Sequence, residues 1–332
     1  MRNRIVVLLL CALVCLAGCH SNKKYEGMPA ELATLCKNID KHPKRAELYY
    51  QRADYYYYHK DLEKGIADMQ TAIRLAPDSS KYYVKLSDLY FAQRETDLAE
   101  EVLQTAIKKE PSNNEARLKL AELYFHLRMM DQCSTALDEA IERQKFNPKA
   151  YLIKAFMLKE SADTTGYLRM LQLVIDQDPK EVKAFLELGY YYQQKLNPLA
   201  ISYYQNGINV DPNNTELHYN LGKLYQDLGQ TDEAEQEYKT VIQIDPKNIA
   251  ALNNLGYMYL DDTVARYSEA VDLFTQAIKA NPQFVYSVCN RGVAYEYLGE
   301  YAKARKDYEK ALKLQTNFEP AIKGLNRLDK LQ

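Results

Sequence analysis

Apolar and polar positions along most of this 332-residue chain follow the period of an amphipathic helix, in pairs of short segments. The first segment of a pair carries apolar, small and aromatic residues spaced i, i+3, i+4 and i+7, which share one helix face. The second segment has small or aromatic residues on one face and is followed by a proline, which cannot continue a helix. The pattern predicts helix–turn–helix units. The pair that begins at Thr215 shows it with His218, Leu221, Gly222 and Tyr225, then Ala234, Tyr238, Val241 and Pro246.

The prolines recur at intervals of 31 to 37 residues between Pro43 and Pro282, so the unit is repeated. One helix pair cannot bury its own apolar face, and neighbouring pairs must therefore stack. We expect eight units within residues 46–318, an additional helix within 29–45 and a capping helix within 319–332. The units are predicted to start near Ala46, Ser80, Asn114, Tyr151, Val182, Thr215, Ile249 and Val285.

The period near 34 residues and the residue types just described resemble the tetratricopeptide repeat (TPR). The resemblance covers nearly all of the chain after the first 28 residues. It implies an all-α solenoid, a right-handed superhelix of helix–turn–helix repeats. It also implies that the first helices line a concave groove, where members of this family usually bind their ligands.

The fourth repeat matches the family pattern least well. Ser161 stands where a tyrosine is expected, the turn at 163–166 is short, and extra residues occur around 144–147. We therefore expect a local irregularity across 144–166. It would be either a point of flexibility or sequence drift without a function.

The N-terminus has the layout of a secretory signal peptide, with a short basic start and an uncharged stretch from Ile5 to Leu16. The tetrapeptide that ends at Cys19 resembles the bacterial lipobox. This resemblance implies that residues 1–18 are removed, that Cys19 carries acyl chains, and that residues 19–28 form a polar tether. Because His20 is not aspartate and the tether is basic, we expect an outer-membrane anchor that faces the periplasm. The alternative is an ordinary signal peptide with a chance cysteine.

Asparagine occupies the sixth position of the last three repeats, at Asn220, Asn254 and Asn290. This position faces the groove, and the arrangement resembles the asparagine ladders by which some TPR proteins hold an extended peptide. An amide offers both a donor and an acceptor, so it can pair with any peptide group. The alternative is that asparagine stands there for helical reasons alone.

The chain contains 29 tyrosines and no tryptophan. Twelve tyrosines occupy packing positions of the repeat, whereas others project to the groove face. Tyrosine combines a large apolar area with a hydrogen-bonding tip, which suits an interface. A groove filled by its own side chains is the alternative. The tyrosines predicted to contact a partner are Tyr50, Tyr57, Tyr190, Tyr219, Tyr257 and Tyr286.

Composition and motifs give no indication of an enzyme. The formal net charge of −2 provides no long-range attraction to nucleic acid. Cys36, Cys133 and Cys289 are far apart, so they form neither a zinc motif nor a disulfide framework. The sequence lacks an HExxH motif, a phosphate-binding loop and a nucleophile elbow, and the five histidines are scattered. We expect no catalytic residue, no cofactor and no metal.

The favoured hypothesis is therefore a scaffold or adaptor of the bacterial cell envelope that binds a peptide or helix of another envelope protein in its groove. The alternative is a glycan- or nutrient-binding lipoprotein, because sugars stack on tyrosine. Short connections between the repeats and the absence of tryptophan count against that alternative. Self-association through the solenoid ends is a third hypothesis, and the polar face of the C-terminal helix counts against it.

Overall fold

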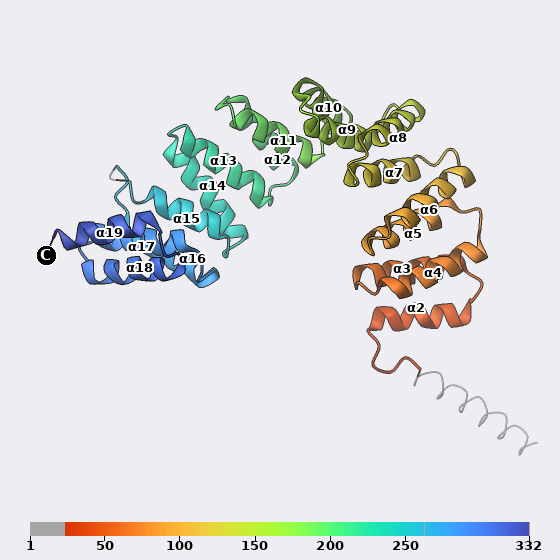
Figure 1. Cartoon of the computed structure of the whole chain (residues 1–332), viewed down its shortest axis with the longest axis horizontal. Helices are drawn as coiled ribbons and strands as arrows, with labels where there is room; N and C mark the ends of the chain where they lie inside the picture. Colours follow the sequence, from red (N-terminus) through yellow and green to blue (C-terminus); the bar gives the residue numbers. More distant parts are fainter. Residues whose placement is uncertain (1–23, 262, 332) are drawn as a thin grey trace, which may run out of the picture. The chain divides into compact units, whose positions relative to one another are not determined.

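The computed structural model describes residues 24–261 and 263–331, and all its regular elements in these ranges are α-helices (Figure 1). The prediction of an all-α fold is confirmed. The predicted signal peptide and Cys19 lie outside the described residues. The helices are α2 Ala30–Lys41, α3 Ala46–Tyr58, α4 Leu62–Leu75, α5 Ser80–Ala92, α6 Thr96–Lys109, α7 Asn114–His126, α8 Met130–Arg143, α9 Pro148–Glu160, α10 Thr164–Gln177, α11 Val182–Gln193, α12 Leu199–Val210, α13 Thr215–Asp227, α14 Thr231–Ile244, α15 Ile249–Met258, α16 Tyr267–Ala280, α17 Val285–Tyr297, α18 Tyr301–Leu314 and α19 Glu319–Asp329.

The helices from α3 to α18 form eight consecutive pairs, with α2 before them and α19 after them. The chain divides into two compact units, and the boundary between Met170 and Leu171 falls within α10. In the N-terminal unit the first helices of successive pairs contact one another, α3 with α5, α5 with α7 and α7 with α9. In the C-terminal unit α11 contacts α13, α15 contacts α17 and α17 contacts α19. The first helices therefore form one layer within each unit, and we call its surface the inner face.

The fourth repeat starts three residues earlier than its sequence pattern indicates. The side chain of Asn147 accepts a hydrogen bond from the backbone N–H of Ala150 at 3.2 Å, and Pro148 is the first residue of α9. Proline is favoured at this position because its missing N–H would have no partner there. The predicted start near Tyr151 is wrong. It treated Pro148 as a proline that follows a helix, as Pro111 does, whereas Pro148 begins one.

With this start, the predicted irregularity across 144–166 disappears. The first helices of the second to fifth repeats begin at Ser80, Asn114, Pro148 and Val182, each 34 residues after the preceding one. The residues around 144–147 are therefore no insertion. The turn at 163–166 is not shortened either, since the link between α9 and α10 has three residues, like that between α5 and α6.

The helices of the C-terminal unit approach closely where a glycine on the first helix meets an aromatic ring on the second. A Cβ atom at Gly189 would lie 2.4 Å from Cε1 of Tyr204, closer than real Cβ contacts allow. In the N-terminal repeats, the equivalent position of the first helix carries alanine or serine, and that of the second helix carries methionine or leucine. Ala53 and Met69 are an example, and both are buried. The glycine–ring pairs are Gly189 with Tyr204, Gly222 with Tyr238, Gly256 with Phe274 and Gly292 with Tyr308.

Each glycine–ring pair involves a third residue, which lies four positions after the glycine, at the end of the first helix. Each buried hydroxyl donates a hydrogen bond there, because an unpaired buried hydroxyl would be costly. Where the ring is Phe274, which has no hydroxyl, the equivalent position is the buried, apolar Leu260. The hydroxyl bonds are Tyr204 to Gln193 at 2.6 Å, Tyr238 to Gln226 at 2.9 Å and Tyr308 to Glu296 at 2.6 Å.

Candidate binding surface

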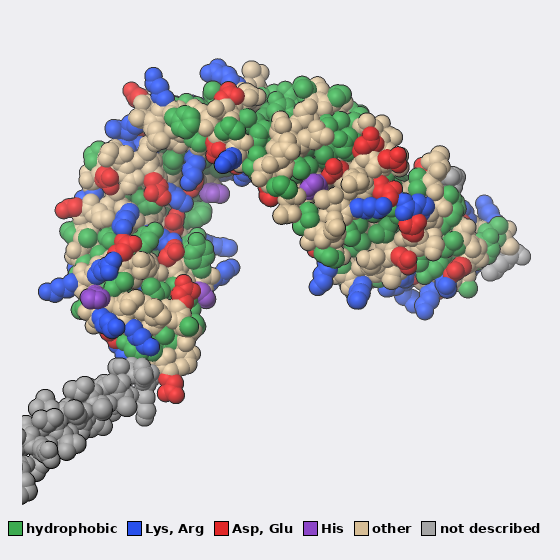
Figure 2. Space-filling model, turned by 180° about the vertical axis from the view of Figure 1, so that it is seen from behind, with side chains coloured by type: hydrophobic (Ala, Val, Ile, Leu, Met, Phe, Trp, Pro, Cys, Tyr) green, Lys and Arg blue, Asp and Glu red, His purple; other side chains and the backbone are tan. Residues whose placement is uncertain are grey.

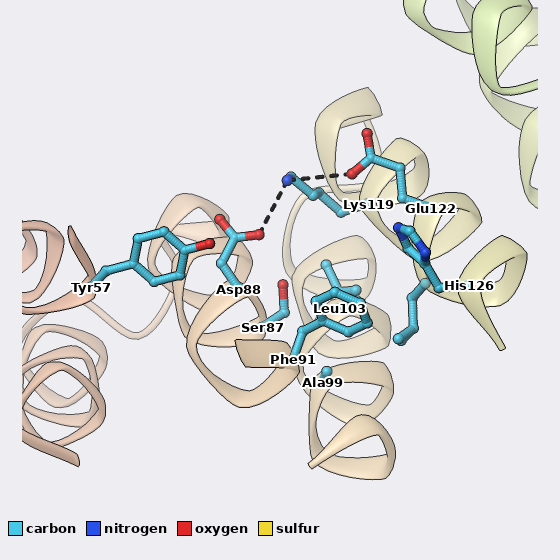
Figure 3. Close-up of a pocket in the computed structure, with 10 residues that line it drawn as sticks. Tyr57, Ser87, Asp88, Phe91, Ala99, Leu103, Lys119, Glu122 and His126 are labelled. Carbon is cyan, nitrogen blue, oxygen red and sulfur yellow. Dashed lines mark ion pairs between the residues drawn. The ribbon is translucent and has the colours of Figure 1, made fainter. Parts of the chain in front are cut away.

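The inner face of the N-terminal unit contains a hollow between α3, α5 and α7, with a volume of about 180 Å³. We call it the N-terminal hollow, and Figure 3 shows it. Its lining combines aromatic rings with charged groups, and it draws residues from three consecutive repeats. The lining residues are Tyr57, Ser87, Asp88, Phe91, Ala99, Leu103, Lys119, Glu122, Leu123 and His126.

Lys119 lies between two carboxylates at one side of this hollow (Figure 3). Its Nζ is 3.1 Å from Oδ1 of Asp88 and 3.3 Å from Oε2 of Glu122. Burial disfavours the charged ammonium, but the two carboxylates outweigh burial and raise the pKa of Lys119. The group therefore stays charged, and the triad carries a net charge of −1. On the other side Phe91 is 41% exposed, and its ring centre is 5.4 Å from that of His126.

Ion pairs also join α5 to α3 on the same face. Lys85 on α5 pairs with Asp54 on α3, and its ammonium lies 4.5 Å from the ring centre of Tyr57. Lys81 pairs with Glu47 at 2.6 Å. Each lysine thus reaches back to the preceding repeat, as Lys119 does. These ion pairs connect the first helices of adjacent repeats, α3 with α5 and α5 with α7, across the inner face of the N-terminal unit.

The three predicted asparagines lie on the inner face of the C-terminal unit, all partly buried. Asn254 donates from Nδ2 to the hydroxyl of Tyr219 at 3.1 Å, and Asn290 donates to Oδ1 of Asn253 at 3.2 Å. Asn220 has no hydrogen-bond partner among the described residues. The Nδ2 of Asn254 also donates to the hydroxyl of Tyr238 at 3.4 Å. Asn254 and Asn290 therefore use their amide N–H groups within the protein and keep a carbonyl oxygen for a ligand. Whether they hold a peptide stays a prediction.

Asn253 is a residue of this face that the sequence analysis did not select. Its Oδ1 accepts hydrogen bonds from Oγ of Ser287 at 2.9 Å and from Asn290. It occupies the fifth position of its repeat, next to the sixth position on which the asparagine pattern rests. The sequence contains two adjacent asparagines here, Asn253 and Asn254, which could have drawn attention to this position. Only the packing of α15 on α17 shows that Asn253 is the one that accepts hydrogen bonds from the next repeat.

The six predicted tyrosines fall into two groups of three. Tyr190, Tyr257 and Tyr286 are 49%, 57% and 54% exposed, all on first helices of the C-terminal unit. The others are partly buried by neighbours on the inner face. Their contacts are Tyr50 with the ring of Tyr82, Tyr57 with Lys85, and Tyr219 with Asn254 and the ring of Tyr238.

Two features of the described residues bear on chemistry, the grouping of possible metal ligands and the state of the cysteine thiols. Among them, no group of three His, Cys, Asp or Glu side chains could hold a metal ion. The cysteines at 36, 133 and 289 are free and buried, and burial raises the pKa of Cys133 to about 11 and that of Cys289 to about 12. Both thiols are therefore protonated near neutral pH and poor nucleophiles. None of the helices in the described ranges has the length and apolar character needed to cross a bilayer.

Models of one repeat family match more than half of the chain. Their description is tetratricopeptide repeat, and they cover residues 46–79, 90–155, 191–256, 251–286 and 286–318. Among curated proteins, the chain is 30% identical over 149 residues to human Protein O-mannosyl-transferase TMTC3. This match covers 41% of the chain but only 16% of TMTC3. Human Superkiller complex protein 3 is 36% identical over 59 residues, which are 18% of the chain and 4% of that protein.

Two solved structures show the same fold. The C-terminal part of a TPR repeat-containing protein from Cytophaga hutchinsonii has a TM-score of 0.59 and 19% identity, and the match covers 73% of this chain and 99% of that one. PilW, a widely conserved type IV pilus biogenesis factor, has a TM-score of 0.50 and 16% identity over 65% of this chain and 99% of its own. The predicted solenoid fold is confirmed, and the chain belongs to the tetratricopeptide-repeat family.

Proposed function

We propose that this protein is a non-enzymatic scaffold that binds a peptide or helix of a partner protein on its inner faces. The observation that carries the proposal is the exposure of Tyr190, Tyr257 and Tyr286. The fold buries other tyrosines completely, such as Tyr204 and Tyr238, so a large tyrosine ring can be accommodated in its core. Three large rings left about half exposed on one helix layer are the kind of anchor that a partner covers.

The polar groups of the same layer suit a polypeptide ligand. The carbonyl oxygens of Asn254 and Asn290 and the whole amide of Asn220 can pair with backbone groups of an extended chain or with polar side chains. In the N-terminal unit, the hollow offers Phe91 for an apolar side chain and the negative triad around Lys119 for a cationic one. A partner would therefore gain apolar contact from the rings and orientation from the amides and charges.

A glycan ligand is the second candidate, because an exposed tyrosine ring can stack on a sugar as well as on a peptide. The same three tyrosines favour this candidate. Binding of a carbohydrate array by the purified protein, without binding of peptides, would support it over the scaffold.

Selection of twelve-residue peptides from a displayed random library tests the scaffold. A variant with Tyr190→Ser, Tyr257→Ser and Tyr286→Ser is expected to bind the selected peptides at least ten-fold more weakly, because it loses the exposed anchors. The matched control replaces Leu98, Leu199 and Tyr301, which are 40%, 50% and 48% exposed on the second helices α6, α12 and α18, with serine. Calorimetric titration gives both affinities. Equal binding by both variants would contradict the assignment of the inner face.

We further propose that acyl chains on Cys19 hold the scaffold in a bacterial cell envelope, on the outer membrane facing the periplasm. Two or three chains anchor a protein stably, since each buried CH₂ contributes about 0.8 kcal/mol. In a bacterial host, Cys19→Ser is expected to move the protein from the membrane to the soluble fraction and to remove the lipid mass from its N-terminal peptide. Mass spectrometry and fractionation measure both, with Cys36→Ser as the control. Membrane retention of the Cys19 variant at full level would contradict the anchor.

A further inference from the structure

A row of four lysines follows one face of α18, at Lys303, Lys306, Lys310 and Lys313. Their spacing of three, four and three residues places them on one side of the helix. Ten residues of helix rise about 15 Å, so the row is about that long. Figure 2 shows Lys and Arg side chains gathered along the lower edge of the C-terminal unit, at the right of the view.

The row lines a groove of about 630 Å³ together with residues of α17. In the floor of this groove the guanidinium of Arg291 is neutralised by Asp307, with two contacts of 2.8 Å. Lys303 pairs with Glu300. The three lysines that follow it have no ion-pair partner among the described residues, and Glu309 is the other carboxylate that lines the groove. We call this surface the outer basic groove.

The repeat fold does not require these lysines. Of the same four positions in the two preceding second helices, all are acidic or neutral except Lys279, so neither of these helices has a row of lysines. The groove at the equivalent place one repeat earlier is lined by two carboxylates, Glu269 and Asp272, and by a single lysine, Lys239, beside neutral side chains. The equivalent residues are Glu233, Gln236, Thr240 and Gln243 on α14, and Glu269, Asp272, Gln276 and Lys279 on α16.

We propose that the outer basic groove binds a short acidic segment of a protein. Charge complementarity identifies the ligand class, since the groove carries three unpaired ammonium groups against one unpaired carboxylate. Its length matches four or five residues of an extended chain at about 3.3 Å per residue. Glutamate or aspartate side chains of such a segment would reach Lys306, Lys310 and Lys313. Because the whole chain has a formal net charge of −2, it lacks the general attraction to polyanions that nucleic-acid binding uses. This site is separate from the inner faces.

Fluorescence anisotropy with a labelled eight-residue peptide of alternating glutamate and serine tests the proposal. The wild-type chain is expected to bind it, and the variant with Lys306→Glu, Lys310→Glu and Lys313→Glu is expected to bind at least ten-fold more weakly. The interaction is also expected to weaken as salt is raised from 50 to about 200 mM, because the groove is open to solvent. A peptide of alternating glutamine and serine is expected not to bind.

The matched control reverses three exposed lysines of the N-terminal unit, Lys41→Glu, Lys44→Glu and Lys108→Glu, and so changes the net charge equally. It is expected to bind the glutamate peptide within two-fold of wild type. Circular dichroism of both variants verifies the helix content.

Equal loss of peptide binding in both variants, or no loss in either, would overturn the assignment. So would oligothymidylate or phosphatidylserine vesicles that bind the same groove as tightly as the peptide. The inner-face serine variant serves as a further reference, because it leaves this groove intact.

Discussion

Gly189→Ala is expected to lower the free energy of unfolding by about 2 kcal/mol, and Tyr204→Leu in the same chain is expected to restore most of that loss. The new methyl group would lie 2.4 Å from Cε1 and 2.6 Å from Cδ1 of the Tyr204 ring, which is completely buried and cannot move aside. Overpacking of this kind costs about 1–3 kcal/mol. The higher helix propensity of alanine recovers at most about 1 kcal/mol.

The rescue follows from the packing of the N-terminal repeats. There alanine or serine on the first helix stands with methionine or leucine on the second, as in Ala121 and Leu137, and both are buried. Tyr204→Leu alone is expected to cost about 2–3 kcal/mol, because it leaves a cavity and removes the hydroxyl that donates to Gln193. Alanine at 189 fills part of that cavity. The double variant is therefore expected within about 1 kcal/mol of wild type, far from the sum of the two losses.

Equilibrium unfolding in urea, followed by circular dichroism, measures all four proteins of this cycle. Gly222→Ala is the graded control, since its Cβ would meet Tyr238 at 3.2 Å, a contact that a small shift can relieve. Its loss should be smaller than that of Gly189→Ala. Additive losses in the double variant would show that the glycine and the ring do not pack as a pair.

The period of the chain predicts most of its fold, because helix packing imposes the same residue types on every repeat. The residues that follow the pattern in the sixth repeat, such as Gly222 and Tyr238, lie in the core as expected. The pattern was wrong at the fourth repeat, where a proline has a different role. Pro148 begins α9 with Asn147 as its cap, and proline alone does not indicate whether a helix ends before it or starts at it.

The candidate surface was less predictable, since position in a repeat gives the direction of a side chain but not its partners. Tyr219 and Tyr257 were both assigned to the inner face, yet the first is held by Asn254 whereas the second is more than half exposed. The N-terminal hollow depends on how α3, α5 and α7 come together. Its lining comes from three repeats, and the ion pair of Lys119 with Asp88 joins residues of adjacent repeats.

The second large effect is expected at Asp68, which links three helices of the N-terminal unit. Its carboxylate accepts two hydrogen bonds of 2.7 Å from Arg52, and Arg52 also donates to Sγ of Cys36 on α2 at 3.3 Å. The side chains are 8% exposed for Asp68 and 21% for Arg52. Asp68→Ala is expected to cost about 3 kcal/mol, because it leaves a mostly buried guanidinium without its counter-ion.

Removing both charges should be much less harmful than removing one. In the variant with Arg52→Met and Asp68→Leu, no unpaired charge stays buried, and we expect a free energy of unfolding within about 1 kcal/mol of wild type. Urea unfolding gives the two values, and hydrogen exchange should show lost protection of the α2 amides in Asp68→Ala. The pair of Arg291 and Asp307 in the eighth repeat has the same bidentate geometry, so Asp307→Ala should have a similar cost. A loss below about 1 kcal/mol for Asp68→Ala would mean that water replaces the carboxylate, and that the pair contributes little to holding α2.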